Sequence, residues 1–201
     1  MVVWQASPPI AVANPSPVAG AGPAASVEEP RLWLPIVHAL GLFSVQRAAE
    51  AYLYPEPFAR ISVRFWGARY KDAFTTPPLF DRTQPAFRWD YDPLHINLVG
   101  HGLMGAELYH RARTCRSSVL GALAFTAGAS AVWEYGFEAN GVRPSAQDLL
   151  YTPLAGLLLG EARFQLFRAA SALSSSKARA VLTAVIDPLG QLERKSGLFP
   201  C

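Results

Sequence analysis

Charged residues are scarce in this chain of 201 residues, at 16% of the total, against about 25% in ordinary soluble domains. A highly charged disordered chain is therefore excluded. The 15 glycines follow no period of three and no longer unit recurs, which excludes a collagen-like protein and a solenoid. Because 51% of the residues are hydrophobic, two classes remain, a compact apolar globule and a small membrane protein.

Cysteine and diagnostic motifs are scarce as well. The two cysteines, Cys115 and Cys201, cannot form a framework of several disulfides, and they do not indicate a compartment. The sequence has no nucleophile elbow, no phosphate-binding glycine loop, no dinucleotide fingerprint and no paired-histidine metal motif. The net charge is only +3, with no basic tail and no groove-reading motif, so we expect no nucleic-acid partner. The motifs likewise predict no cofactor and no metal.

The first 30 residues differ in composition from the rest. Residues 1–30 contain six prolines, seven alanines and only two charged residues, Glu28 and Glu29. This composition offers neither a helical nor a strand pattern and predicts a disordered leader. A secretory signal needs a basic residue before an unbroken apolar core, and this segment has neither, so we do not expect it to direct export.

From residue 31 onward, the spacing of apolar residues predicts an all-α protein, a bundle of about four helices. The helices are expected at residues 31–54, 92–113, 117–138 and 145–173. The last three form a core over residues 92–173. The segment 55–91 is rich in proline and aromatic residues, so we expect an aromatic-rich loop or interfacial segment, and we expect 174–201 to be a C-terminal tail.

We expect this bundle to be embedded in a membrane, with a lipid bilayer as its partner. The 17 residues Ser117–Trp133 carry no charge, and a full crossing needs about 20 apolar residues. Cations gather at one end of the predicted core helices and acids at the other, as the positive-inside rule predicts: Arg111, Arg113, Arg163 and Arg168 against Asp90, Asp92, Glu134 and Glu138. Trp66, Trp89 and Tyr91 suit the membrane interface.

Each predicted core helix carries one polar stripe in which residues are spaced by four. The stripes are Asn97, His101, Gly105 and Tyr109; Ser130, Glu134 and Glu138; and Asp148, Thr152, Gly156 and Gly160. Ser145, three residues before Asp148, is the expected N-cap of its helix. If the stripes face one interior, they form a polar cluster of His101, Glu134, Glu138 and Asp148.

These residues also have simpler interpretations. A single histidine is more often satisfied by a neighbouring carbonyl or carboxylate than used as a ligand, and Glu138 is favoured as an exposed helix cap. Glu134 beside so apolar a run is costly unless it is paired or protonated, which favours a functional role. One histidine and three carboxylates suit a divalent metal, but bundles also bury polar networks for structure alone. The glycines favour close helix packing, within the chain or by self-association.

Three segments resemble the bacterial domain-of-unknown-function family 3943, over roughly residues 88 to 194. They read WDYDPLHINLVGHGLMGAELYHRAR, SAVWEYGFEANGVRPSAQDLLYTPLAGLLLGE and IDPLGQLER. A more remote similarity to VanZ-like membrane proteins rests on a histidine, a glutamate on the next helix and a step into a glycine-rich helix. That step reads Arg143-Pro144-Ser145-Ala146-Gln147-Asp148, with a shifted spacing after the arginine. The family resemblance implies a bacterial envelope or membrane-associated helical protein and no particular reaction.

We therefore predict a membrane or envelope-associated helical protein whose buried polar cluster of His101, Glu134 and Asp148 is non-catalytic. One alternative is a metal-dependent or histidine-based hydrolase-like membrane enzyme, in which His101 acts as the base. Another is a soluble or periplasmic interaction protein that buries its glycine stripe against a partner. The bacterial inner membrane is the favoured location, with the envelope or periplasm as the alternative.

Overall fold

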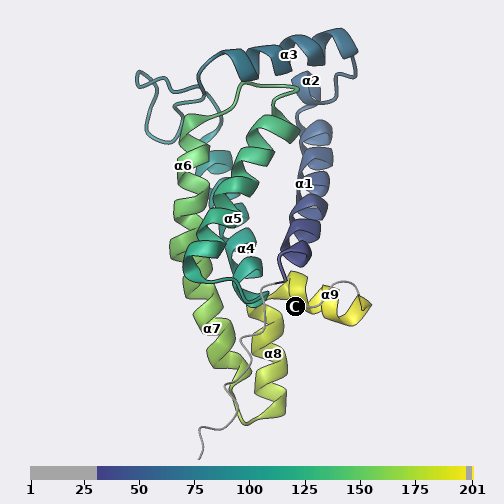
Figure 1. Cartoon of the computed structure of the whole chain (residues 1–201), viewed down its shortest axis with the longest axis vertical. Helices are drawn as coiled ribbons and strands as arrows, with labels where there is room; N and C mark the ends of the chain where they lie inside the picture. Colours follow the sequence, from purple (N-terminus) through teal and green to yellow (C-terminus); the bar gives the residue numbers. More distant parts are fainter. Residues whose placement is uncertain (1–30, 198–200) are drawn as a thin grey trace, which may run out of the picture.

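A computed structural model describes residues 31–197 and Cys201, so the leader predicted at 1–30 lies outside the described residues. All regular elements in the described part are helical, as predicted. Short π-helical stretches, labelled η, continue three of the α-helices. Four long segments run side by side (Figure 1): α1 (Trp33–Leu53); η1 (Ile96–Gly100) with α4 (His101–Thr114); α5 (Val119–Val132) with η2 (Trp133–Glu138); and α6 (Ala146–Ala155), η3 (Gly156–Gly160) and α7 (Glu161–Ser171).

Helix α4 lies at the centre of the bundle and contacts α1, α5, α6, η3 and α7. Its close approach to α6 and η3 requires glycine. A Cβ atom at Gly105 would lie 2.1 Å from the carbonyl oxygen of Thr152, and one at Gly156 would lie 2.8 Å from the carbonyl oxygen of Gly105. A Cβ atom at Gly160 would lie 2.8 Å from the Cβ atom of Tyr109. The predicted glycine stripe therefore packs helices within one chain.

The apolar core lies between α1, α4 and the α5–η2 segment. Phe43, Met104, Leu108 and Trp133 are its largest buried members. Serine side chains begin α5 and α6, where Ser118 accepts a hydrogen bond from the backbone N–H of Gly121 and Ser145 accepts one from that of Asp148. Such N-caps satisfy backbone donors that the first helical turn leaves free.

The segment 55–91 is more than the loop we predicted. It contains α2 (Pro55–Phe58) and α3 (Val63–Thr75), and α3 lies across one end of the bundle (Figure 1). The side chain of Ser62 caps α3 by accepting a hydrogen bond from the backbone N–H of Phe65. The loop prediction gave too much weight to the five prolines of the segment, because all of them lie outside α3.

The segment 174–201, which we expected to be a C-terminal tail, contains α8 (Ser176–Ile186) and α9 (Pro188–Ser196). Asp187 between them is fully buried, and its carboxylate forms an ion pair of 3.0 Å with Arg111 of α4. Cys115, at the end of α4, forms a disulfide with Cys201. These long-range contacts hold the C-terminal helices against the bundle. No local pattern in the sequence predicts them.

We expected membrane-embedded helices, and the uncharged run Ser117–Trp133 was the strongest candidate. Most of that run forms α5, which has 14 residues. Among the helices of the described residues, none is both long enough and apolar enough to cross a membrane.

Candidate metal centre

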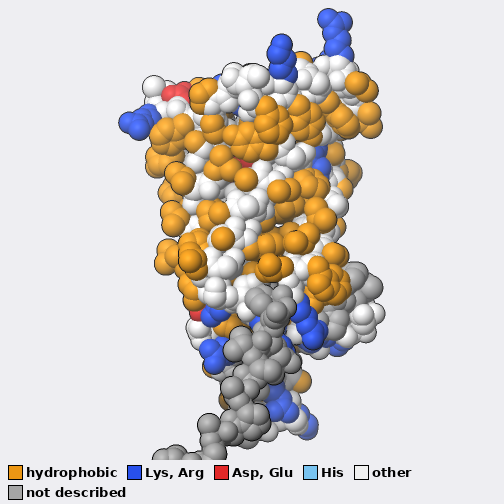
Figure 2. Space-filling view, viewed as in Figure 1, with side chains coloured by type: hydrophobic (Ala, Val, Ile, Leu, Met, Phe, Trp, Pro, Cys, Tyr) orange, Lys and Arg blue, Asp and Glu red, His pale blue; other side chains and the backbone are white. Residues whose placement is uncertain are grey.

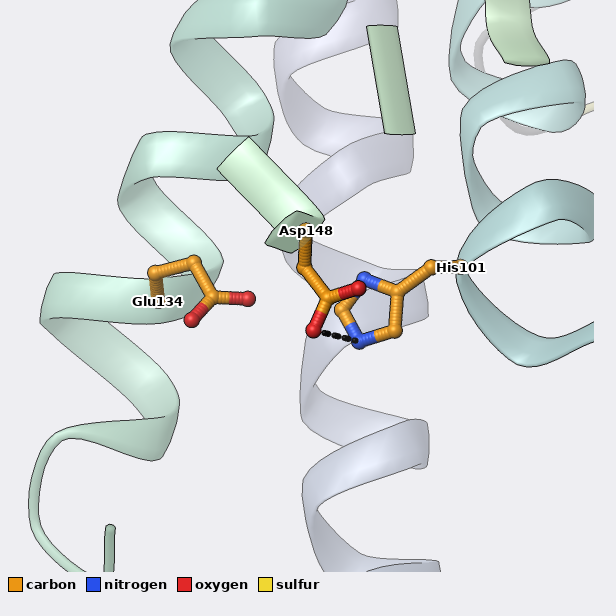
Figure 3. A group of neighbouring side chains, drawn as sticks. All are labelled: His101, Glu134 and Asp148. Carbon is orange, nitrogen blue, oxygen red and sulfur yellow. Dashed lines mark ion pairs between the residues drawn. The ribbon is translucent and has the colours of Figure 1, made fainter. Parts of the chain in front are cut away.

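Three buried side chains from three helical segments meet inside the bundle (Figure 3). His101 is the first residue of α4, Glu134 belongs to η2, and Asp148 lies in the first turn of α6. One potential ligand atom from each residue lies within 4.8 Å of the other two. The side chains point toward one another, and their residues are at most 5% exposed. The structure thus brings together the three residues in which the sequence analysis expected a polar cluster.

His101 is held by the helix that also carries Asp148. Its Nδ1 atom lies 3.0 Å from the hydroxyl of Thr152, and its Nε2 atom lies 3.7 Å from Oδ2 of Asp148. Burial lowers the pKa of His101 to about 4, so the imidazole is neutral at pH 7. A neutral imidazole oriented by a hydrogen bond on one nitrogen is the form that binds metals through the other nitrogen.

The pKa values of the carboxyl groups in the cluster lie well above their ordinary values. Burial and the neighbouring Asp90 raise the pKa of Asp148 to about 8. Burial, followed by the charge of Asp148, raises the pKa of Glu134 well above its usual range. The cause is physical: negative charge removed from water and placed beside other negative charge is costly without a compensating cation. The cluster therefore holds protons or a cation at neutral pH.

A second layer of hydrogen bonds fixes the carboxylates. The backbone N–H of Ser145 donates to Oε2 of Glu134 at 2.7 Å, and the hydroxyl of Ser145 lies 2.6 Å from Oδ2 of Asp90. Asn97 donates to the other oxygen of Asp90 at 2.7 Å. Such an outer layer orients ligands in metal sites. Burial by itself would raise the pKa of Asp90, but hydrogen bonds from Asp148 and Ser145 lower it.

One oxygen of Glu134 has no partner. Glu134 is 1% exposed, yet its Oε1 atom makes no hydrogen bond. No lysine or arginine of the described residues forms an ion pair with Glu134, Glu138 or Asp148. A buried, unpaired carboxylate oxygen in an acidic cluster calls for an explanation, and a bound proton or a bound cation supplies one.

A pocket of about 290 Å³ at the α3 end of the bundle reaches Glu134 of the cluster. Glu134 and Glu138 line its inner wall, together with Asp90 and Ser145, while Arg69 belongs to α3. The pocket provides a route between solvent and Glu134. Five carboxyl groups and two arginines, Arg69 and Arg143, line the pocket, so its acidic residues outnumber its basic ones, a balance that favours cations.

The other predicted site residues lie outside the group formed by His101, Glu134 and Asp148. Glu138 is buried at 6% exposure, so its interpretation as an exposed cap is wrong. Burial and the charge of Glu134 raise the pKa of Glu138 well above its usual range. Asn97 belongs to the second layer. Tyr109 is remote from the cluster, because its hydroxyl donates to Glu161 at 3.0 Å on the α7 side of α4.

Sequence reasoning missed the role of Asp90 in this site. Asp90 reaches Ser145 because Leu79 pairs with the strand-like residues before α6: its N–H donates to Pro144 at 2.7 Å and its carbonyl accepts from Ala146 at 3.0 Å. That pairing joins residues separated by more than 60 positions. No signal in the sequence predicts it, since the residues around Leu79 show no strand pattern.

A family model described as Domain of unknown function (DUF3943) matches residues 86–189, just over half of the chain. The chain belongs to this family. The DUF3943 region contains Asp90, His101, Glu134 and Asp148, and it also contains the buried Asp187. No curated protein and no solved structure matches the chain. The DUF3943 assignment therefore brings no reaction with it, and the chemistry of the site is argued from its geometry.

Proposed function

We propose that His101, Glu134 and Asp148 bind one divalent transition-metal ion. The observation that carries this proposal is the unpartnered, buried Oε1 atom of Glu134, which lies in a cluster where three potential ligand atoms are mutually within 4.8 Å. Imidazole favours zinc and its neighbours in the transition series, and carboxylates are accepted by the same ions. Zn²⁺ is therefore the first ion to test, with Mn²⁺ second.

A site with three protein ligands supports metal-assisted hydrolysis better than a purely structural role. Structural zinc sites are usually closed by four protein ligands, whereas catalytic ones keep a position open for water. A metal held here would supply Lewis acidity and a bound water of lowered pKa. Glu134 is the ligand that lines the pocket, so a small polar substrate would approach the metal from the Glu134 side. This is the metal-dependent alternative of the sequence analysis, now favoured by geometry.

The test is metal binding by the full chain and by single-site variants. The chain is stripped with a chelator, and Zn²⁺ is titrated by calorimetry, with the bound metal counted by elemental analysis. We expect one ion per chain. E134Q and D148N each remove a ligand, and we expect each to weaken binding by more than about 100-fold, since even outer-layer changes cost about 10- to 100-fold.

The matched control is E161Q, a change of the same chemical kind at a carboxylate that pairs with Arg113 outside the cluster. It should bind zinc like the wild type. Circular dichroism of each variant checks that the helices persist. Zinc binding that survives E134Q and D148N, or a wild-type chain that takes up no metal, would contradict the proposal and leave the cluster as a protonated structural network.

We also propose that the bundle works in contact with a lipid bilayer. Besides its apolar core, the bundle buries large polar side chains: Arg111, His110, Glu134 and Asp148 are among its largest fully buried side chains. Large apolar side chains are exposed on α1, α5, α6, η3 and α8 instead. Figure 2 shows hydrophobic side chains spread over one face of the bundle, and large exposed apolar surfaces mark sites of contact with a membrane or a protein.

Fractionation tests this second proposal. Cells that express the full chain are lysed, and their membranes are washed with alkaline carbonate, which strips proteins held only by charge. We expect the chain to stay in the pellet and to be released by detergent. Its release by carbonate alone would contradict the proposal, and the apolar side chains would then require a protein partner.

A further inference from the structure

The end of the bundle at α2 and α3 presents large apolar side chains that are mostly exposed. Tyr52, Ile61 and Val63 are 86%, 88% and 90% exposed. Leu53 and Phe74 are more than half exposed. We call this surface, with the exposed cations Arg60, Arg64 and Lys71 beside it, the α3 corner. A side chain exposed to this degree gains nothing from the fold, so its burial has to come from outside the chain.

Cations lie among these apolar side chains. Arg60, Arg64 and Lys71 are exposed on α3 and on the residues before it, and Glu56 is the exposed acid of α2. Arg69 and Asp72 belong to the pocket on the inner side of α3. The exposed charge of the α3 corner is therefore positive. Figure 2 shows lysine and arginine side chains projecting from this end, above a broad apolar surface.

This combination identifies the chemistry of the partner. A short helix that lies across the end of a bundle, with apolar and cationic side chains exposed together, has the features of a helix in the headgroup layer of a membrane. A second copy of the chain fits poorly, because two α3 corners would bring arginines against arginines. Charge complementarity requires a surface that is both apolar and negative.

We propose that the α3 corner docks onto anionic lipid headgroups. The inference rests on the membrane contact proposed above and adds the lipid class and the part of the chain that recognises it. Arg69 and Asp72 of α3 line the pocket that leads to Glu134. Docking at the α3 corner therefore places the entrance of the candidate metal centre at the level of the headgroups, where polar lipid groups are its nearest potential ligands.

The test is flotation of the full chain with two kinds of vesicle, neutral phosphatidylcholine and phosphatidylcholine mixed with anionic phosphatidylglycerol. The corner variant R60Q/R64Q/K71Q removes three positive charges from the α3 corner. The control K177Q/R179Q/K195Q removes the same charge from exposed positions on α8 and α9. We expect the corner variant to lose about 100-fold in affinity for anionic vesicles while neutral vesicles bind it unchanged, and the control to lose far less.

The outcomes separate the two proposals. A wild-type chain that floats with neither vesicle contradicts the membrane contact itself and this inference with it. A wild-type chain that binds both vesicles equally contradicts only the preference for anionic lipid. Equal losses in the corner variant and the control reject the α3 corner as the docking surface. Light scattering completes the test, because a dimer that disappears in the corner variant would assign this surface to a second copy.

Discussion

The closest backbone approach in the bundle predicts opposite effects for two glycine-to-alanine substitutions. In G105A, the new methyl group would lie 2.1 Å from the Thr152 carbonyl oxygen and 3.2 Å from the Gly156 nitrogen. Real Cβ contacts essentially never fall below 3.0 Å, so α4 and α6 must separate by about 1 Å. Overpacking against backbone costs about 3 kcal/mol, and replacing a helical glycine returns about 1 kcal/mol. We expect a net loss of about 2 kcal/mol.

The matched control is G128A in α5, where the added methyl group meets no atom within 4 Å. Only the helix propensity changes there, so the free energy of unfolding should rise by about 0.5 to 1 kcal/mol. Denaturant unfolding followed by circular dichroism measures both variants under the same conditions. A G105A variant as stable as the wild type, or a stability shift of the same sign in both variants, would contradict the predicted clash.

Three further predictions concern the ionisable groups and the disulfide. Burial opposes ionisation of Glu107, but the hydrogen bond from His38 and the charge of Arg163 lower its pKa from 4.5 to about 2. Its contribution to stability is thus complete above pH 4.5 and lost as the pH falls toward 2, and in E107Q the acid unfolding curve should be flatter over that range. Burial raises the pKa of Glu50 from 4.5 to about 7, and the charge of Arg47 partly offsets this effect. The folded protein therefore loses stability as the pH rises through 7, where Glu50 ionises. In thermal unfolding at pH 8, E50Q should be more stable than the wild type. The Cys115–Cys201 disulfide spans 86 positions, so C115S/C201S should lower the free energy of unfolding by up to about 4 kcal/mol. Unchanged stability in this variant, together with two reactive thiols in the wild type, would exclude the disulfide.

The helical core was predictable because its signals are local. Apolar spacing predicts α1 and the helices that carry His101, Glu134 and Asp148, and Ser145 with Asp148 indicates the start of α6. The ion pair between Arg111 and Asp187 was not predictable, because it joins residues 76 positions apart. Single charged residues carry no information about such distant partners. The same holds for Asp90, because its hydrogen bond with Ser145 joins residues 55 positions apart.

The three π-helical stretches explain why residue spacing could suggest the site but not define it. A π-helical turn is wider than an α-helical turn, so residues spaced by four no longer lie directly above one another. In η1 the N–H of His101 bonds to the carbonyl of Ile96, five residues earlier. Asn97 is thereby directed to Asp90, whereas His101 faces Asp148.

The same departure from α-helical geometry occurs on each of the other ligand-bearing segments. Glu134 and Glu138 both belong to η2, and η3 begins three residues after Pro153 of α6, which lacks the backbone donor that an α-helix needs. Such bulges cost helical hydrogen bonding, and they occur frequently at functional sites. Glu134 lies within η2 and His101 directly follows η1, and this placement favours a site that the fold is shaped to hold over a polar network left by chance in the packing of four helices.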